Sequence, residues 1–219
     1  MKRKKLLLLL LLAPLLMQAQ THPPFWADIQ QFHKQDSLHF PGTGKILFVG
    51  SSSFTKWTDV QDYFPQYPII NRGFGGSTLK DVIRYAPDVI FPYEPKQIII
   101  YCGENDFAED TSLYPAQVAQ RFEELFTLIR SRFKKVPIVY ISMKPSPSRA
   151  FLMPRFNVAN VMIKSFLKTK KKTTFIDVYH AMLGTDGKPL PGIYIDDNLH
   201  MNAAGYKIWQ KLIAPHLLK

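Results

Sequence analysis

A serine-rich segment, Gly50-Ser51-Ser52-Ser53, follows a short apolar run at residues 45–49 and could supply a nucleophile. Glycine permits a sharp turn, so one serine hydroxyl can be presented at a strand end, where a neighbouring base would activate it. By itself the segment favours a strand-end turn or a serine-rich helix cap. It is not the Gly-x-Ser-x-Gly elbow of other hydrolases, because Phe54 stands in place of the last glycine. It is not a phosphate loop either, since no Gly-Lys-Ser/Thr element follows.

An aspartate and a histidine near the C-terminus could complete an acyl-transfer site with one of these serines. Asp197 precedes His200 by three positions. At that spacing the carboxylate can orient the imidazole through one ring nitrogen while the other takes a proton from serine. The same Asp-x-x-His spacing occurs at Asp177 and His180. Spacing alone therefore does not choose between the two pairs.

Two further segments contain groups that could stabilise the negative charge that develops during acyl transfer. They are Asn71-Arg72-Gly73-Phe74-Gly75-Gly76-Ser77 and Gly103-Glu104-Asn105-Asp106. A glycine N–H and an asparagine amide are suitable oxyanion donors, and the loss of one donor typically costs ~10²–10³ in rate. Both segments also fit ordinary turns, in which Gly, Asn and Asp are common.

The elements that must position these groups alternate between strands and helices. Apolar runs predict buried strands at residues 45–49, 68–70, 98–101, 137–141 and 174–176. Helical periodicity predicts helices at residues 115–133, 154–170 and 203–212, and in the second of these Val158, Met162, Ile163, Phe166 and Leu167 are expected to face the core. This alternation favours a parallel sheet covered by helices, with a site beyond the carboxyl ends of the strands. Each polar segment follows such a strand or lies near the C-terminus.

Taken together, the four segments resemble those of the SGNH, or GDSL-type, hydrolase family, in the family's order and over nearly the whole chain after residue 20. The resemblance implies a three-layer α/β/α sandwich with a five-stranded parallel sheet of the flavodoxin-like type. It also implies an acylhydrolase that needs no metal and no organic cofactor. The resemblance gives catalytic roles to Ser52, Asp197 and His200, and oxyanion-hole roles to Ser52, Gly76 and Asn105.

Two features of the sequence affect which of its residues are assigned the family's catalytic roles. Asn202 and the Gly205-Tyr206 pair follow His200 as in the family's last segment, which favours Asp197 and His200 over the other pair. Ser51, however, replaces the aspartate of the family's Gly-Asp-Ser. Ser51 or Ser53 therefore remains an alternative nucleophile.

The first 20 residues have the pattern of a secretory signal peptide. A basic start at residues 2–5 precedes a leucine-rich run at residues 6–16, which is shorter than the ~20 apolar residues that span a bilayer. We expect cleavage near Ala19 and Gln20 and a periplasmic or extracellular protein without stable membrane insertion; an uncleaved anchor is the alternative. The expected organisation is a signal peptide at 1–20, a lead-in segment at 21–44 and one hydrolase domain at 45–219.

Charge and cysteine content limit the classes of partner and the covalent links that we expect. The chain carries 28 Lys and Arg against 17 Asp and Glu, and residues 1–20 contain four of the basic residues and no acidic one, which leaves +7 on the remainder. The basic cluster at residues 168–172 falls at a predicted helix end, where cations are favourable, so we expect no nucleic-acid partner. Cys102 is the single cysteine; it cannot form an internal disulfide and is expected to be a buried small hydrophobe.

The resemblance and the expected export predict an esterase for short acyl groups, O-acetyl esters of carbohydrates above all, with a small-molecule or glycan ester as partner. One rival is a lipase or lysophospholipase acting on longer chains. Another is a non-catalytic glycan-binding module in which aromatic residues such as Trp26, Trp57 and Trp209 stack on sugars. Arg72 and the loop at residues 144–149 could lie near the site, but the sequence assigns them no contacts.

Overall fold

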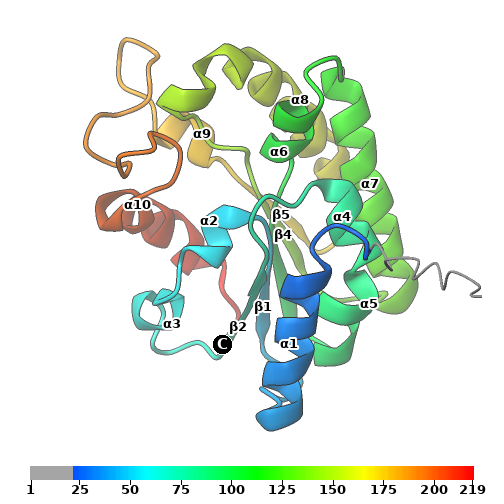
Figure 1. Ribbon diagram of the computed structural model, residues 1–219. Coiled ribbons are helices and arrows are strands. Elements are labelled where there is room, and N and C mark those ends of the chain that lie inside the picture. The colour runs from blue at the N-terminus through cyan, green and yellow to red at the C-terminus, as the bar shows by residue number, and fades with distance from the viewer. Residues whose placement is uncertain (1–21) are drawn as a thin grey trace, which may run out of the picture.

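The computed structural model describes residues 22–219, and a five-stranded parallel sheet forms its centre (Figure 1). The strands are β1 (Ile46–Gly50), β2 (Ile69–Gly73), β3 (Gln97–Tyr101), β4 (Ile138–Ile141) and β5 (Thr173–Ile176), in the spatial order β2-β1-β3-β4-β5. This order confirms the predicted flavodoxin-like arrangement, in which the ligand site lies where the connections change direction beside β1. The predicted signal peptide lies outside the described residues.

Helices cover both faces of the sheet and complete three layers. They are α1 (Trp26–Leu38), α2 (Ser52–Thr55), α3 (Val60–Tyr63), α4 (Leu79–Arg84), α5 (Ala86–Val89), α6 (Glu104–Glu109), α7 (Pro115–Arg132), α8 (Met153–Lys168), α9 (Val178–Ala181) and α10 (Ala203–Ile213), with 3-10 segments at Phe91–Tyr93, Pro147–Leu152 and Ala214–His216. One core joins the sheet to α1, α4, α5, α7 and α8, and the other joins it to α2, α3 and α10 (Figure 1). The alternating strand residues divide between the two cores, as expected for a sheet that is buried on both faces.

The helix at α8 begins and ends close to its predicted bounds, but the predicted inward face is partly wrong. Ile163 and Leu167 are buried, whereas Val158 and Met162 are 47% and 41% exposed. The buried Asn160 takes a core position instead. Its side chain accepts a hydrogen bond from the Met143 amide and donates one to the Met143 carbonyl, both at 2.9 Å. The buried face of α8 thus consists of Met153, Phe156, Ala159, Asn160, Ile163 and Leu167, a regular helical stripe that leaves Val158 and Met162 outside it.

The segment before β1 packs as part of the same layer. Ile29 of α1 belongs to the core, and Asp36 of α1 accepts a hydrogen bond from Arg72 at 2.5 Å and one from the Tyr93 hydroxyl at 2.5 Å. The Arg72 guanidinium also lies over the ring of Phe32, 5.1 Å from its centroid. Arg72 of β2 thus links β2 to α1 through its contacts with Asp36 and Phe32.

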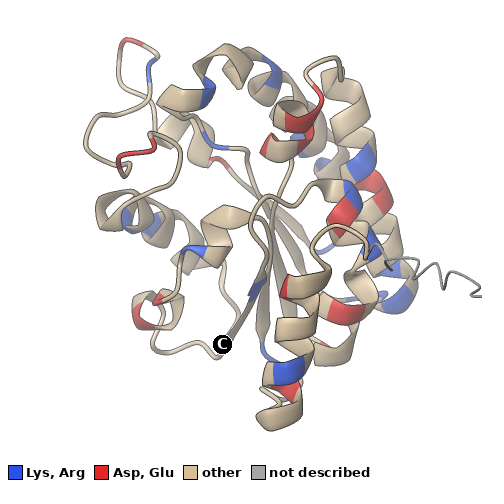
Figure 2. Ribbon diagram, in the orientation of Figure 1, with Lys and Arg blue, Asp and Glu red and all other residues tan. Residues whose placement is uncertain are grey.

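The charged residues are distributed differently among the outer helices. Figure 2 shows Lys and Arg interspersed with Asp and Glu on α1, α4 and α7, whereas α8 and α10 carry only Lys and Arg. Among residues 22–219, no helix is both long enough and apolar enough to cross a membrane. Cys102 is buried, as predicted, and burial raises the pKa of its thiol.

Candidate active site

The carboxyl ends of β1, β2 and β3 lie in register, so the polar segments that follow them converge. Gly50 pairs with Gly73 on one side and with Tyr101 on the other. Gly50 has φ +145°, and a Cβ atom there would come within 1.9 Å of the Tyr101 carbonyl oxygen. Only glycine fits this close approach, which lets the chain leave β1 and turn directly into α2.

Ser52 and His200 meet at this edge of the sheet. His200 Nε2 lies 2.8 Å from Ser52 Oγ, although the residues are 148 positions apart in the sequence. His200 Nδ1 lies 2.5 Å from Asp197 Oδ2. A carboxylate, an imidazole and a hydroxyl in this sequence of hydrogen bonds can transfer the hydroxyl proton to Nε2 while the carboxylate stabilises the ring.

The three neighbouring serines differ in access. Ser51 and Ser53 are buried, with 4% and 2% of their surface exposed, whereas Ser52 is partly exposed and contacts His200. Ser52 is the first residue of α2, so its backbone N–H has no partner inside the helix. The geometry thus places Ser52 at the site and turns the other two hydroxyls away from solvent.

Hydrogen bonds keep the Asp197 carboxylate charged. Burial is the largest single influence on its pKa and raises it, but hydrogen bonds from the His200 ring and from the His200 and Leu199 amides together outweigh burial and lower the pKa of Asp197 to about 2. Because this is below the ordinary value of 3.8, ionised Asp197 stabilises the folded loop above about pH 4, and the contribution is lost as the pH falls through about 2. Asp197 is therefore negative beside His200 at neutral pH.

The second Asp-x-x-His pair has the same local geometry but no serine partner. His180 Nδ1 lies 2.8 Å from Asp177 Oδ2, and the His180 amide donates to Asp177 Oδ1 at 3.1 Å. The His180 side chain is 62% exposed, and within residues 22–219 its Nε2 contacts no hydroxyl or thiol at hydrogen-bond distance. Asp177 serves as the N-cap of α9.

The segments after β2 and β3 bring further N–H donors to the edge of the sheet that carries Ser52, where a Cβ atom added to Gly75 would lie 3.7 Å from Ser52 Cβ. In the described chain the backbone N–H groups of Ser52 and Gly76 have no hydrogen-bond partner, and Gly76 adopts φ +88°, which glycine tolerates. Asn105 donates one amide hydrogen from Nδ2 to the Ser77 carbonyl at 3.0 Å and retains a second. Asp106 ties the two loops together, since it accepts a hydrogen bond from the Leu79 amide at 2.9 Å. Such donors can stabilise an oxyanion.

A buried charged cluster orients Asn105. Arg149 donates from Nη2 to Asn105 Oδ1 at 2.8 Å and from Nη1 to Glu104 at 3.3 Å, and Lys144 Nζ also contacts Glu104, at 3.4 Å. Because arginine can only donate, this contact fixes the amide with its oxygen toward Arg149 and its nitrogen toward Ser77. The sequence alone assigns no contact to this loop, because only the fold brings together residues that are 40 to 45 positions apart.

The loop at residues 144–149 also supports the segment that carries His200. The Tyr194 hydroxyl donates to the Pro145 carbonyl at 2.9 Å, and the Ser148 amide donates to the Asn198 carbonyl at 3.1 Å. From the other side, Asn202 donates to the Tyr194 carbonyl at 3.2 Å while it caps α10. The loop thus braces both the Asn105 amide and the His200 segment.

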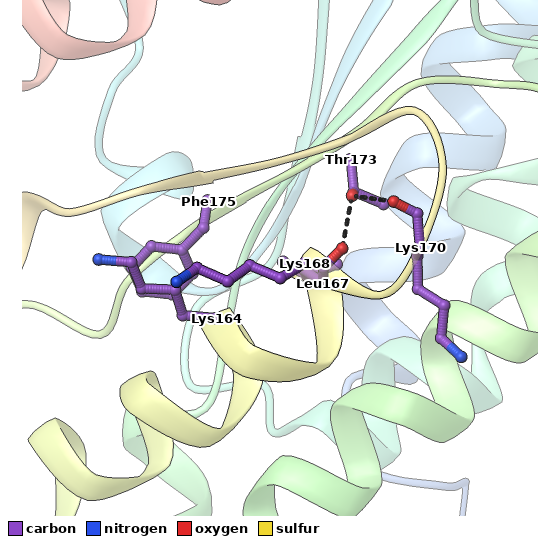
Figure 3. Close-up of a pocket in the computed structure, with 6 residues that line it drawn as sticks. All are labelled: Lys164, Leu167, Lys168, Lys170, Thr173 and Phe175. Atoms are coloured by element: carbon purple, nitrogen blue, oxygen red, sulfur yellow. Dashed lines mark hydrogen bonds between the residues drawn. The ribbon is translucent and has the colours of Figure 1, made fainter.

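A pocket of about 450 Å³ opens beside Gly76 and Asn105. Its other lining residues are Pro24, Phe25, Thr78, Lys80, Asp81, Arg84 and Glu109. A separate pocket between α8 and β5 contains none of the site residues; Figure 3 shows Lys164 lying along Phe175 there, with Lys168 and Lys170 nearby. Across residues 22–219, no three His, Cys, Asp or Glu side chains are grouped closely enough to hold a metal ion.

Several solved structures that are similar to this chain are described as acylhydrolases, lipases or acetyl esterases. A protein of Bacteroides fragilis NCTC 9343, provisionally described as an acylhydrolase, is 25% identical over 87% of this chain and 96% of that chain, with a TM-score of 0.73. A GDSL-like lipase of Bacteroides thetaiotaomicron VPI-5482 is 23% identical over 87% and 97%, with a TM-score of 0.72. A variant of an acetyl xylan esterase of Geobacillus stearothermophilus is 16% identical over 81% and 98%, with a TM-score of 0.62. No curated protein matches the sequence significantly.

The GDSL-like Lipase/Acylhydrolase family matches residues 36–208, which include the segments of Ser52, Gly76, Asn105, Asp197 and His200. The match covers most of the chain and confirms the resemblance found in the sequence. It also argues against the reading as a binding module, since the family and its structural neighbours hydrolyse esters with a serine nucleophile. The chain therefore belongs to the GDSL-like lipase/acylhydrolase family and is an ester-hydrolysing serine hydrolase.

Proposed function

We propose that this protein is an exported esterase that removes short acyl groups, O-acetyl above all, from carbohydrates, with Ser52, His200 and Asp197 as its catalytic triad. The chain of hydrogen bonds from Ser52 Oγ through the imidazole to the Asp197 carboxylate carries the catalytic part of this proposal. The basic and apolar pattern of residues 1–20 supports export.

In the proposed reaction, His200 Nε2 takes the Ser52 proton while Oγ bonds to the ester carbonyl carbon. The carbonyl oxygen becomes an oxyanion and accepts hydrogen bonds from the Ser52 and Gly76 amides and from Asn105 Nδ2. When the intermediate collapses, the ester C–O bond breaks and the alcohol leaves with the proton from His200. Water then attacks the acyl-serine with His200 as base, which releases the acid and restores Ser52.

The lining of the pocket beside the oxyanion donors supports a short acyl group and a polar substrate. Pro24 and Phe25 are the apolar side chains that line the pocket with Gly76, and Lys80, Arg84 and Glu109 are among its charged side chains. A long alkyl chain would have to desolvate these charged groups without pairing them, which is unfavourable. One structural neighbour acts on acetylated xylan by its description, so acetylated xylan is a reasonable first polymer to test.

Chain-length preference tests the substrate proposal directly. We expect kcat/KM on p-nitrophenyl acetate to exceed that on the octanoate by at least about tenfold, because added methylenes must enter the charged part of the pocket. The purified protein should also release acetate from acetylated xylan. Faster hydrolysis of the octanoate would favour the long-chain lipase instead, and loss of only the xylan activity would redirect the search to other acetyl esters.

Removal of the Asn105 amide is expected to lower kcat by ~10²–10³ with little change in KM, since the donor acts on charge that develops only in the transition state. Arg149→Ala, which keeps the amide but releases its orientation, should give a smaller loss of about tenfold. Steady-state kinetics of Asn105→Ala and Arg149→Ala on p-nitrophenyl acetate measure both. A rise in KM with unchanged kcat would assign Asn105 to substrate binding.

A further inference from the structure

Phe25 lies over one of the proposed oxyanion donors. A Cβ atom added to Gly76 would come within 3.5 Å of the Phe25 ring. Phe25 and Pro24 line the same pocket as Gly76 and Asn105. The family match begins at residue 36, so the segments common to the family do not account for this aromatic side chain.

Specific contacts hold Phe25 in this place. Its ring packs edge-on against Phe74, with centroids 5.4 Å apart, and the Tyr85 hydroxyl donates to the Pro24 carbonyl at 2.7 Å. The Phe25 carbonyl accepts a hydrogen bond from the Ile29 amide at 3.1 Å, at the start of α1. Its backbone is left-handed, with φ 64° and ψ 7°. Bulky residues rarely adopt this conformation, and it persists where the surroundings enforce it.

The position of the pocket relative to His200 indicates which part of an ester it receives. The leaving alcohol must lie near His200, because that residue returns the proton to it. The oxyanion points to the donors, so the acyl substituent projects away from His200. The pocket is lined by Gly76 and Asn105 but by neither Ser52 nor any residue of the segment at 193–201. It therefore meets the reaction centre on the side of the oxyanion donors, which is the side toward which the acyl substituent projects.

We propose that Phe25 is a specificity-determining residue that forms the wall of the acyl pocket and limits the length of the acyl group. This inference rests on the proposed esterase function. The ring occupies the space directly beside the oxyanion donors, so an acetyl group fits against it and a longer chain must pass it toward the charged residues Lys80 and Arg84. The segment at residues 22–44 thus contributes to selectivity as well as to packing.

Two substitutions at Phe25 test the wall in opposite directions. Phe25→Ala removes the ring, and we expect the octanoate-to-acetate ratio of kcat/KM to rise at least about tenfold while acetate turnover changes by less than about threefold. Phe25→Trp enlarges the wall, and we expect the butyrate-to-acetate ratio to fall. The measurement is the steady-state kinetics of protein produced from the full chain, on p-nitrophenyl acetate, butyrate and octanoate.

Phe32→Ala is the matched control. Phe32 lies on α1, packs against the core and touches Arg72, but it does not line the pocket. It should leave all substrate ratios within about twofold of the unmutated protein. An equal shift of the ratios in Phe32→Ala would reduce Phe25 to a structural anchor and overturn the inference.

The outcomes separate this inference from the function on which it rests. If the unmutated protein cleaves acetate but neither Phe25 variant shifts a ratio, the inference is wrong and the esterase proposal stands. If the unmutated protein hydrolyses none of the three esters, both are wrong. Should Phe25→Ala fail to fold, Phe25→Trp decides, and an unchanged butyrate-to-acetate ratio then overturns the inference.

Discussion

Replacement of Ser52 with alanine is expected to lower kcat for ester hydrolysis by about 10⁶, to a small residual rate supplied by the remaining donors and by binding. The physical reason is that Ser52 Oγ is the only group at the site placed to form the acyl intermediate, 2.8 Å from His200 Nε2. Hydrolysis of p-nitrophenyl acetate measures the loss. Mass spectrometry of the protein quenched during turnover should detect an acetyl group on the peptide that contains Ser52.

The neighbouring serines provide the controls. Ser51→Ala and Ser53→Ala remove buried hydroxyls that do not contact His200, so kcat should stay within about tenfold of the unmutated value. A thermal melt of each variant separates a folding defect from a catalytic one. Full activity in Ser52→Ala, or abolished activity in a well-folded Ser51→Ala or Ser53→Ala, would show that the nucleophile is misassigned.

Substitution of Asp197 by asparagine should lower kcat by about 10⁴ while the fold is kept. The amide cannot stabilise the imidazolium, and it favours the wrong tautomer of His200. Because the pKa of Asp197 is about 2, the carboxylate is ionised at every pH used in an ordinary assay. Titration of Asp197 should therefore add no inflection to the pH profile of kcat of the unmutated protein between pH 6 and pH 9.

Asp177→Asn is the matched control, since the chain contains the same Asp-x-x-His arrangement twice. Asp177 caps α9, so its replacement should lower the melting temperature slightly, but kcat should not change. Likewise, His200→Ala should lose activity, whereas His180→Ala should keep it. If Asp177→Asn lost activity while Asp197→Asn kept it, the proposed triad would be built on the wrong pair.

The order of elements and the edge of the sheet that carries the site followed from the sequence. Apolar runs at the five strands and the polar segments after them depend on local composition, and parallel strands must end at a common edge. The sequence was a weaker guide to which face of each helix is buried. Val158 and Met162 lie outside the buried face of α8, whereas the polar Asn160 lies inside it because its side chain bonds both the amide and the carbonyl of Met143.

The geometry within each Asp-x-x-His motif is also determined by the local sequence. Both aspartates accept hydrogen bonds from the ring and from the amide of the histidine three positions later, at Asp177 and at Asp197. A spacing of three residues is enough to form this arrangement, so it arises wherever the motif begins a turn. It therefore carries no information about which histidine meets a serine.

Tertiary structure alone decided the remaining features. Ser52 meets His200 because α10, which follows His200, packs against the same face of the sheet as α2. Arg149 reaches Asn105, and Phe25 covers Gly76, through contacts between segments far apart in the chain. Such contacts depend on how the layers pack, which no local pattern specifies; the sequence supplied the reactive groups, and the packed layers determined which of them meet.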